Sequence, residues 1–184
     1  MFDAGEFLDE LRGALRENIP QKAVREALAR AAARPYDELE RAFGPAERAE
    51  LKTLYRSPEL TVLKIVWAPG MSIDPHDHRM WAVIGIYGGV EDSQYFRRRP
   101  PGLERVAAKT LARGEVATLG HDVIHAVKNP RSTPTAAIHV YGGDFFATPR
   151  SEWDPETQEE RPSSGERSRE LFLRFGGVVI TEVE

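Results

Sequence analysis

The residues of this sequence best suited to chemistry are its five histidines, which all fall between positions 76 and 139. They are His76, His78, His121, His125 and His139. The chain contains no cysteine, which excludes disulfides, thiolate metal sites, iron–sulfur clusters and a cysteine nucleophile. A transition metal bound by this protein would therefore have histidine and carboxylate ligands.

Two of these histidines, His76 and His78, are separated by a single residue. Residues i and i+2 of a β-strand project from the same face, so one strand would present both imidazoles to one ion. A His-x-His pair alone is a weak indication, because packing and surface histidines are common. A second segment follows downstream, in which Gly114 precedes a turn, His125 and then Asn129.

The two segments together resemble the paired motifs of the cupin superfamily. Its first motif is a glycine, five residues and His-x-His; its second is a glycine, a turn, a histidine and an asparagine four residues later. The turn here departs from the family, with Gly120 and Asp122 where proline and glycine are usual. The resemblance implies a mainly β, double-stranded β-helix (jelly-roll) barrel. The matching residues are Gly70, His76, His78, Gly114, His125 and Asn129.

Many cupins have a glutamate ligand four or five residues after the second histidine, but Ala82 and Val83 stand there in this chain. Glu91 lies beyond the turn at 88–89, and we expect it to be an exposed hairpin charge. The resemblance therefore implies a metal site of three neutral imidazoles with open positions for other ligands, as in catalytic sites. Its ligands would be His76, His78 and His125. Imidazole suits Fe, Ni, Cu and Zn alike.

Residues 54–145 resemble one branch of these proteins, the cysteine dioxygenase-like thiol dioxygenases. That family uses non-haem Fe(II) and O2 to convert a thiol to a sulfinic acid. The resemblance implies that His139 and Tyr141 form a pair beside the metal, in which the phenol donates a hydrogen bond to bound oxygen or thiolate. Fe(II) is the implied cofactor, with Ni, Zn or another divalent metal as the alternative in purified protein.

Two departures from this branch bear on the activity. The family often has a serine two positions before the histidine of the pair, and Ala137 stands there. Animal enzymes have a cysteine crosslinked to the tyrosine, and Val83 occupies that position. The absence of the crosslink fits bacterial relatives of the family.

A substrate carboxylate would need a cation. The cysteine-specific relatives carry an arginine just before the first long strand, which makes Arg56 and the adjacent Tyr55 candidates for substrate binding. A solvent-exposed arginine at a helix end is the alternative for Arg56. Strand alternation should point Arg79 away from the histidine pair, and His121 should face solvent. We expect a solvated hairpin end at Arg97, Arg98 and Arg99.

The hydrophobic pattern of the rest of the chain predicts a barrel of β-strands that carries these residues, preceded by helices. Residues 1–56 predict helices, including one from 45 through 54, and form a helical cap. Residues 57–184 would form the barrel, with a mobile polar loop at 149–169. Strands are expected at 61–67, 80–87, 91–96, 105–111, 115–119, 124–128, 136–141, 171–175 and 178–182.

Composition narrows the function classes. The 184 residues carry 25 basic and 29 acidic side chains, so the net charge is −4. That balance argues against a broad nucleic-acid or anionic-membrane surface. No window reaches the roughly 20 apolar residues of a membrane span, and the acidic N-terminus lacks a signal core, so we expect a cytoplasmic protein. The sequence does not specify an oligomeric state.

Two classes of function follow. The first is a thiol dioxygenase-like enzyme that acts on a small thiol, of the cysteine or mercapto-acid type, with O2. The alternative is a metal-binding cupin of other function, either a ligand-binding or sensor module or a metal-dependent lyase or hydrolase, because a fold does not settle an activity.

Overall fold

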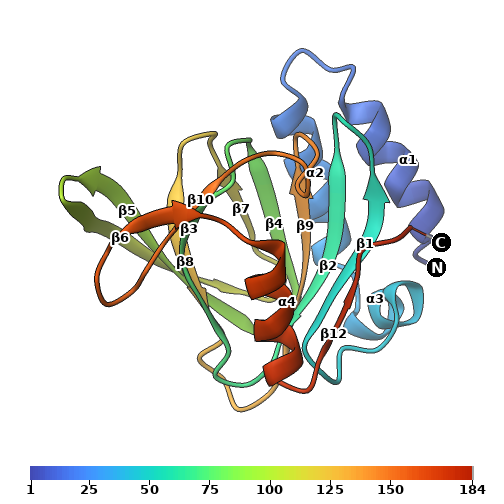
Figure 1. Cartoon of the computed structure of the whole chain (residues 1–184). Coiled ribbons are helices and arrows are strands. Elements are labelled where there is room, and N and C mark those ends of the chain that lie inside the picture. The colour runs from blue at the N-terminus through green and yellow to red at the C-terminus, as the bar shows by residue number, and fades with distance from the viewer. Residues whose placement is uncertain (184) are drawn as a thin grey trace.

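The computed structural model describes residues 1–183, which form two sheets with helices outside them (Figure 1). The strands of both sheets pair in antiparallel fashion, except that β12 runs parallel to β1 at the edge of the first sheet. The first sheet has the order β12-β1-β2-β9-β4-β7, and the second has the order β11-β10-β3-β8-β5-β6. Strands β2 to β9 thus divide into the four-strand sets β2-β9-β4-β7 and β3-β8-β5-β6. This is the order of a jelly roll, and it confirms the mainly β, cupin-type fold.

The strands of the first sheet are β1 (Glu50–Arg56), β2 (Thr61–Trp67), β4 (Ala82–Gly88), β7 (Val116–Leu119), β9 (Thr135–Tyr141) and β12 (Val178–Ile180). Those of the second are β3 (Ser72–Asp77), β5 (Val90–Arg99), β6 (Gly102–Ala112), β8 (Ile124–Lys128), β10 (Ser151–Trp153) and β11 (Glu160–Pro162). The helices are α1 (Ala4–Ala14), α2 (Pro20–Ala32), α3 (Tyr36–Phe43) and α4 (Gly165–Arg174).

Strands β2, β4 and β9 are buried along their whole length because both of their faces are covered. On β9, Ala136, Ile138 and Val140 face the helices, with which they form one apolar cluster. Ala137 and Tyr141 belong to a second cluster inside the barrel. This alternation directs every second residue of β9 toward the interior.

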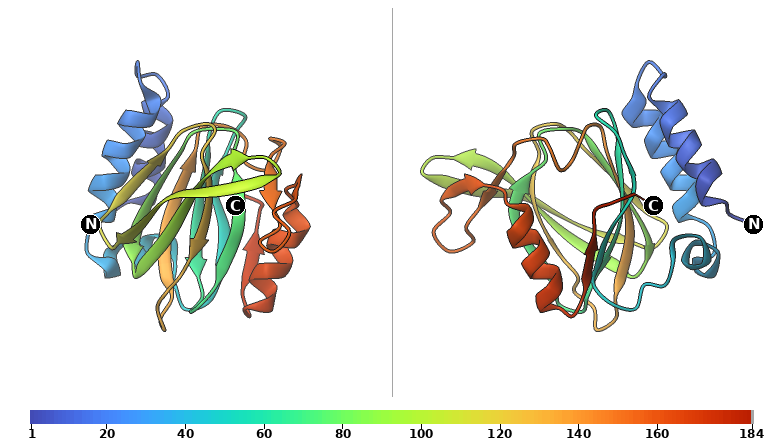
Figure 2. Two further views of the ribbon diagram at one scale, coloured as in Figure 1. Left: turned by 90° about the vertical axis from the view of Figure 1, so that its left-hand side faces the viewer. Right: turned by 45° about the vertical axis from the view of Figure 1, so that its right-hand side comes forward.

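Helices α1, α2 and α3 cover the outer face of the first sheet, while α4 lies on the opposite side of the molecule (Figure 2). Ser164 caps α4 by accepting a hydrogen bond from the Arg167 amide. The fully buried Phe172 of α4 packs against Trp67, with ring centroids 5.7 Å apart. This contact fixes α4 beside the barrel interior.

Three expectations from the sequence are wrong. Residues 45–54 do not form a helix: α3 ends at Phe43, and β1 follows from Glu50, where Leu51 and Thr53 alternate inward and pair with β2. Residues 171–175 are not a strand but the end of α4, because Ser164 caps a helix there. The segment 149–169 is not one loop, since it contains β10, β11 and the start of α4.

The division at residue 56 falls at the end of β1, so residues 1–56 contain three helices and a strand of the first sheet. Asn129, which matched the second motif, is fully buried. Its Nδ2 donates to the carbonyls of Trp67, Ala68 and Thr133 within 3.1 Å, so it links the end of β8 to the end of β2. Among the described residues, no helix is long and apolar enough to cross a membrane.

Candidate metal centre

Three histidines come together inside the barrel. The ligand atoms of His76, His78 and His125 all lie within 4.8 Å of one another. Nε2 of His78 is 3.2 Å from Nε2 of His76 and 3.4 Å from Nε2 of His125. Nitrogens bound to one ion at 2.0–2.1 Å in tetrahedral geometry are separated by about 3.4 Å, so these three atoms fit a shared metal.

The pairing of β3 with β8 creates this cluster. His76 lies directly opposite His125 in the antiparallel ladder. The register shifts between Ile73 and His76, where β3 holds one residue more than β8. Pro75 falls within this β-bulge, a position that tolerates the lack of an amide donor. The extra residue puts His76, in place of Pro75, opposite His125.

His78 lies one residue beyond the end of β3. Between the two histidines, Asp77 is buried and points elsewhere: it accepts from the Ser151 amide at 2.8 Å and pairs with Arg79 at 2.7 Å. Asp77 therefore holds β3 against β10 without joining the histidine cluster. Arg79 turns to Asp77, in agreement with the expectation that it points away from the cluster.

Hydrogen bonds and stacking orient the outer sides of the imidazoles. Nδ1 of His76 lies 2.9 Å from the Asp74 carbonyl, which leaves Nε2 of His76 to face the cluster. The Tyr95 ring stacks on His125 at 6.3 Å with an interplanar angle of 18°. A hydrogen bond to the far side of a histidine sets its ring orientation in metal sites, and the Asp74 carbonyl supplies one for His76.

All three imidazoles are held neutral. Burial lowers the pKa of His76 to about 4. Burial, together with the neighbouring histidines, holds the pKa of His78 and of His125 well below the usual range. Metal ligation requires the deprotonated nitrogen, so these donors stay competent at neutral and mildly acidic pH. No carboxylate joins the three histidines in the described part of the chain.

His139 and Tyr141 lie beside this cluster on β9. Nδ1 of His139 and the Tyr141 hydroxyl are hydrogen-bonded at 3.0 Å. The Tyr141 ring meets His78 edge-on, with centroids 5.0 Å apart. Burial lowers the pKa of His139 to about 3 and raises that of Tyr141. A neutral phenol therefore lies against one of the candidate ligands.

Glu91 is not an exposed hairpin charge, as the sequence suggested, but is fully buried. One carboxylate oxygen, Oε2, accepts from Trp67 Nε1 at 2.9 Å, and the other accepts from Ser93 Oγ at 3.3 Å. The same Oε2 lies 4.0 Å from Nε2 of His139. The expectation failed because Glu91 and Ser93 alternate inward along β5, a spacing already visible in the sequence.

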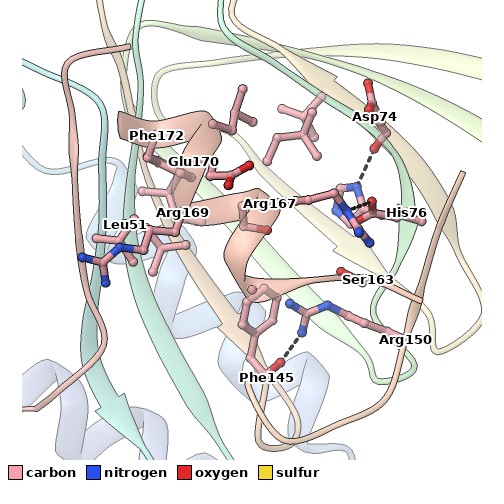
Figure 3. A pocket seen from close by; sticks show the side chains of 18 of the residues that line it. Leu51, Asp74, His76, Phe145, Arg150, Ser163, Arg167, Arg169, Glu170 and Phe172 are labelled. Atoms are coloured by element: carbon pink, nitrogen blue, oxygen red, sulfur yellow. Dashed lines mark hydrogen bonds and ion pairs between the residues drawn. The ribbon is translucent and has the colours of Figure 1, made fainter. Parts of the chain in front are cut away.

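The cluster opens into a cavity of about 860 Å³, of which Figure 3 shows a part. His76, His78, His125, His139 and Tyr141 all line it. Helix α4 contributes Arg167, Arg169, Glu170 and Phe172 to the wall. The cavity wall thus combines the imidazoles and the phenol of the barrel interior with charged side chains of α4.

The half-buried Arg150 places its cation at this cavity. Its guanidinium lies 3.7 Å from the centroid of the Phe145 ring and donates to the Phe145 carbonyl (Figure 3). Its positive charge contributes to the lowered pKa values of His76 and His78. Arg150 was not among the residues predicted from the sequence, because it follows β9 in a segment expected to be a mobile loop.

The structure does not bring Arg56 and Tyr55 to this cavity. Arg56 forms a two-pronged ion pair with Asp144, with contacts of 2.9–3.2 Å. Tyr55 packs against the helical cluster, under the guanidinium of Arg12. His121 is exposed, as expected, and its Nδ1 contacts Asp122.

No protein-family model matches the chain. Among solved structures, it is similar to an RmlC-like cupin family protein with a double-stranded β-helix fold from Methanocaldococcus jannaschii. Identity is 14%, the TM-score is 0.47, and the match covers 55% of this chain and 85% of that one. A cupin 2 conserved barrel domain protein from Leptotrichia buccalis is 22% identical, with a TM-score of 0.41 and coverage of 50% and 39%.

Oxalate oxidase in complex with glycolate is a further similar structure, at 14% identity and a TM-score of 0.45. The match covers 54% of this chain and 53% of that one. Oxalate oxidation is a property of that enzyme, and similarity at this level implies no substrate for this chain.

The three-histidine cluster predicts the metal content of the protein. His125→Ala should lower bound divalent metal from about one equivalent by at least tenfold, because it removes one of three ligands. His121→Ala is the matched control and should keep full occupancy, since His121 is exposed and outside the cluster. Elemental analysis of both purified variants measures this. Full occupancy in His125→Ala would contradict the assignment.

Proposed function

We propose that this protein is a metal-dependent thiol dioxygenase, which oxidises a small thiol with O2 to a sulfinic acid. The observation that carries the proposal is the convergence of three neutral imidazoles, without a carboxylate, beside the buried His139–Tyr141 pair. The resemblance to cysteine dioxygenase-like sequences names the reaction. His76, His78 and His125 would hold Fe(II), which when bound supplies the redox chemistry between a thiolate and O2.

The residues of the chain have separate tasks in this reaction. The barrel interior excludes water and orients the thiol beside the three histidines. Tyr141, which lines the cavity next to His78, hydrogen-bonds to the sulfur or oxygen of the reactants. His139 orients the phenol through its 3.0 Å hydrogen bond.

Arg150 takes the role of substrate cation that the sequence suggested for Arg56. Arg150 lines the same cavity as the histidines, whereas Arg56 is engaged by Asp144. Within the described chain, the Phe145 carbonyl is the acceptor that Arg150 contacts, so further guanidinium donors remain for a ligand. A guanidinium binds a carboxylate through two parallel hydrogen bonds, which favours thiols that carry an acidic group.

A second candidate function draws support from the size of the cavity. A volume of about 860 Å³ exceeds the needs of a thiol the size of cysteine, and charged residues of α4 line its outer part. A metal-dependent lyase or hydrolase acting on a larger anionic substrate would use this space. Such an enzyme would contain Zn²⁺ and consume no O2.

The proposed reaction predicts thiol-dependent O2 uptake. Protein reconstituted anaerobically with Fe(II) should consume O2 with at least one member of a panel of cysteine, 3-mercaptopropionate and cysteamine. Tyr141→Phe should lower kcat by about 10- to 100-fold, because the phenol hydroxyl contacts the reacting atoms. An oxygen electrode measures the uptake. Absence of uptake with every thiol would overturn the proposal.

The assignment of Arg150 predicts how KM depends on the substrate. Arg150→Met should raise KM for 3-mercaptopropionate by about tenfold or more, because a charge-assisted contact to the carboxylate is lost. KM for cysteamine, which has no carboxylate, should change little. Arg56→Met serves as the matched control and should leave KM unaltered for both 3-mercaptopropionate and cysteamine. An equal effect of the two variants would refute the role given to Arg150.

A further inference from the structure

Glu91 is a buried carboxylate to which the proposed function gives no role. The resemblance supplied no counterpart for it, and it contacts none of the three histidines of the metal cluster. It lies on β5, in the second sheet, and reaches across the interior to Trp67 on β2 of the first sheet. An ionisable group at 0% exposure is costly to bury, which calls for an explanation.

His139 is a close neighbour of the Glu91 carboxylate inside the barrel. Nε2 of His139 is buried and has no hydrogen-bond partner among residues 1–183. Glu91 Oε2 lies 4.0 Å away, a gap too short to hold a bridging water. Hydrogen bonds in catalytic sites are often long in unliganded structures and shorten when the substrate binds.

On the other side of the ring, Nδ1 of His139 bonds to the Tyr141 hydroxyl, which lines the cavity. Glu91, His139 and Tyr141 therefore lie in a row from the barrel interior to the cavity, joined by the His139–Tyr141 hydrogen bond and by the 4.0 Å approach of Glu91 to His139. Ala137 lies two residues before His139 on the inward face of β9 and offers the ring no polar partner. Glu91 supplies from the opposite sheet the group that β9 itself lacks.

We propose that Glu91 is the terminal proton acceptor of a relay that runs from the cavity through Tyr141 and His139. The inference rests on the proposed function, because the proton comes from the thiol substrate. It identifies Glu91 as a residue that acts through His139 and never touches the substrate.

The relay moves one proton at each link and no electrons. The S–H bond of the thiol breaks as its proton passes to Tyr141 Oη, while the phenol proton passes to His139 Nδ1. The proton on His139 Nε2 passes to the Glu91 carboxylate. Tyr141 and His139 both end neutral, the substrate becomes a thiolate and Glu91 becomes a carboxylic acid. The phenol then donates its hydrogen bond to the new thiolate.

The surroundings of Glu91 suit it to accept a proton near neutral pH. Burial raises its pKa to about 7, against the opposing hydrogen bonds from Trp67 and Ser93. The other titratable groups that bear on it are His139 and Tyr141 on β9, Tyr95 on its own strand and the adjacent Asp92. A base with a pKa near the working pH is the most effective one.

The test measures the tautomer of His139 in the full-length, ¹⁵N-histidine-labelled protein, treated with a chelator so that no paramagnetic ion broadens the signals. Spectra are recorded above and below the Glu91 pKa of about 7. Above it, we expect the proton of His139 on Nε2, because the carboxylate accepts it. Below it, the carboxylic acid donates to Nε2, and the proton should lie on Nδ1.

Glu91→Gln removes the titration but keeps the shape, so it should show a single tautomer at both pH values. Ser93→Ala removes the hydrogen bond to Oε1, which holds the Glu91 pKa down, so His139 should still switch in this variant, at a higher pH than in the wild type. A wild-type protein that does not switch would overturn the relay, even if the variant failed to fold. A switch that persists in Glu91→Gln would overturn it as well.

A second readout separates the relay from the proposed function. In thiol-dependent O2 uptake, Glu91→Gln should lower kcat by about 10²-fold and add nothing further to Tyr141→Phe, because both act in one chain. Uptake that is unchanged in Glu91→Gln contradicts the relay alone. If the tautomer switches but no thiol supports uptake by the wild type, the proposed function fails and the coupling of Glu91 to His139 stands.

Discussion

The cross-strand pair of His76 and His125 is the constraint on which the site depends, because it makes the register of β3 against β8 decide whether a metal site exists. Side chains alternate between the two faces of a strand, so a slip of one residue would turn His125 out of the barrel. The bulge around Pro75 sets that register by placing one additional residue in β3. Asp77 then secures the strand from its other face through β10.

Burial gives the assembled residues their chemistry. Inside the barrel, imidazoles lose protons and carboxylates gain them, since each loses the hydration of its charged form. His76, with a pKa of about 4, is therefore ready to bind a cation. Glu91, with a pKa of about 7, is ready to exchange a proton. Removal of water from these side chains thus keeps the imidazoles neutral for metal binding and lets Glu91 accept a proton near neutral pH.

Much of this arrangement could be predicted from short-range patterns. Strands β2 and β8 begin and end where alternation and turn residues predicted, and the three histidines meet as the motif spacing implied. Long-range packing decided the rest. The spacing of Leu51 and Leu54 suits a helix, yet this segment forms strand β1 because it pairs with β2. Arg150 reaches the cavity only because the chain after β9 folds back over the barrel, which no local pattern encodes.

X-ray absorption spectroscopy of the Fe(II)-loaded protein is the decisive test of the three-histidine site, because it reports which types of ligand surround the metal. We expect three imidazole nitrogens and no protein carboxylate on the metal, with the remaining positions filled by water or a thiol. The sulfur of added 3-mercaptopropionate should appear as a new ligand while the three imidazoles remain. A metal bound by fewer than three imidazoles, or by a protein carboxylate, would contradict the account.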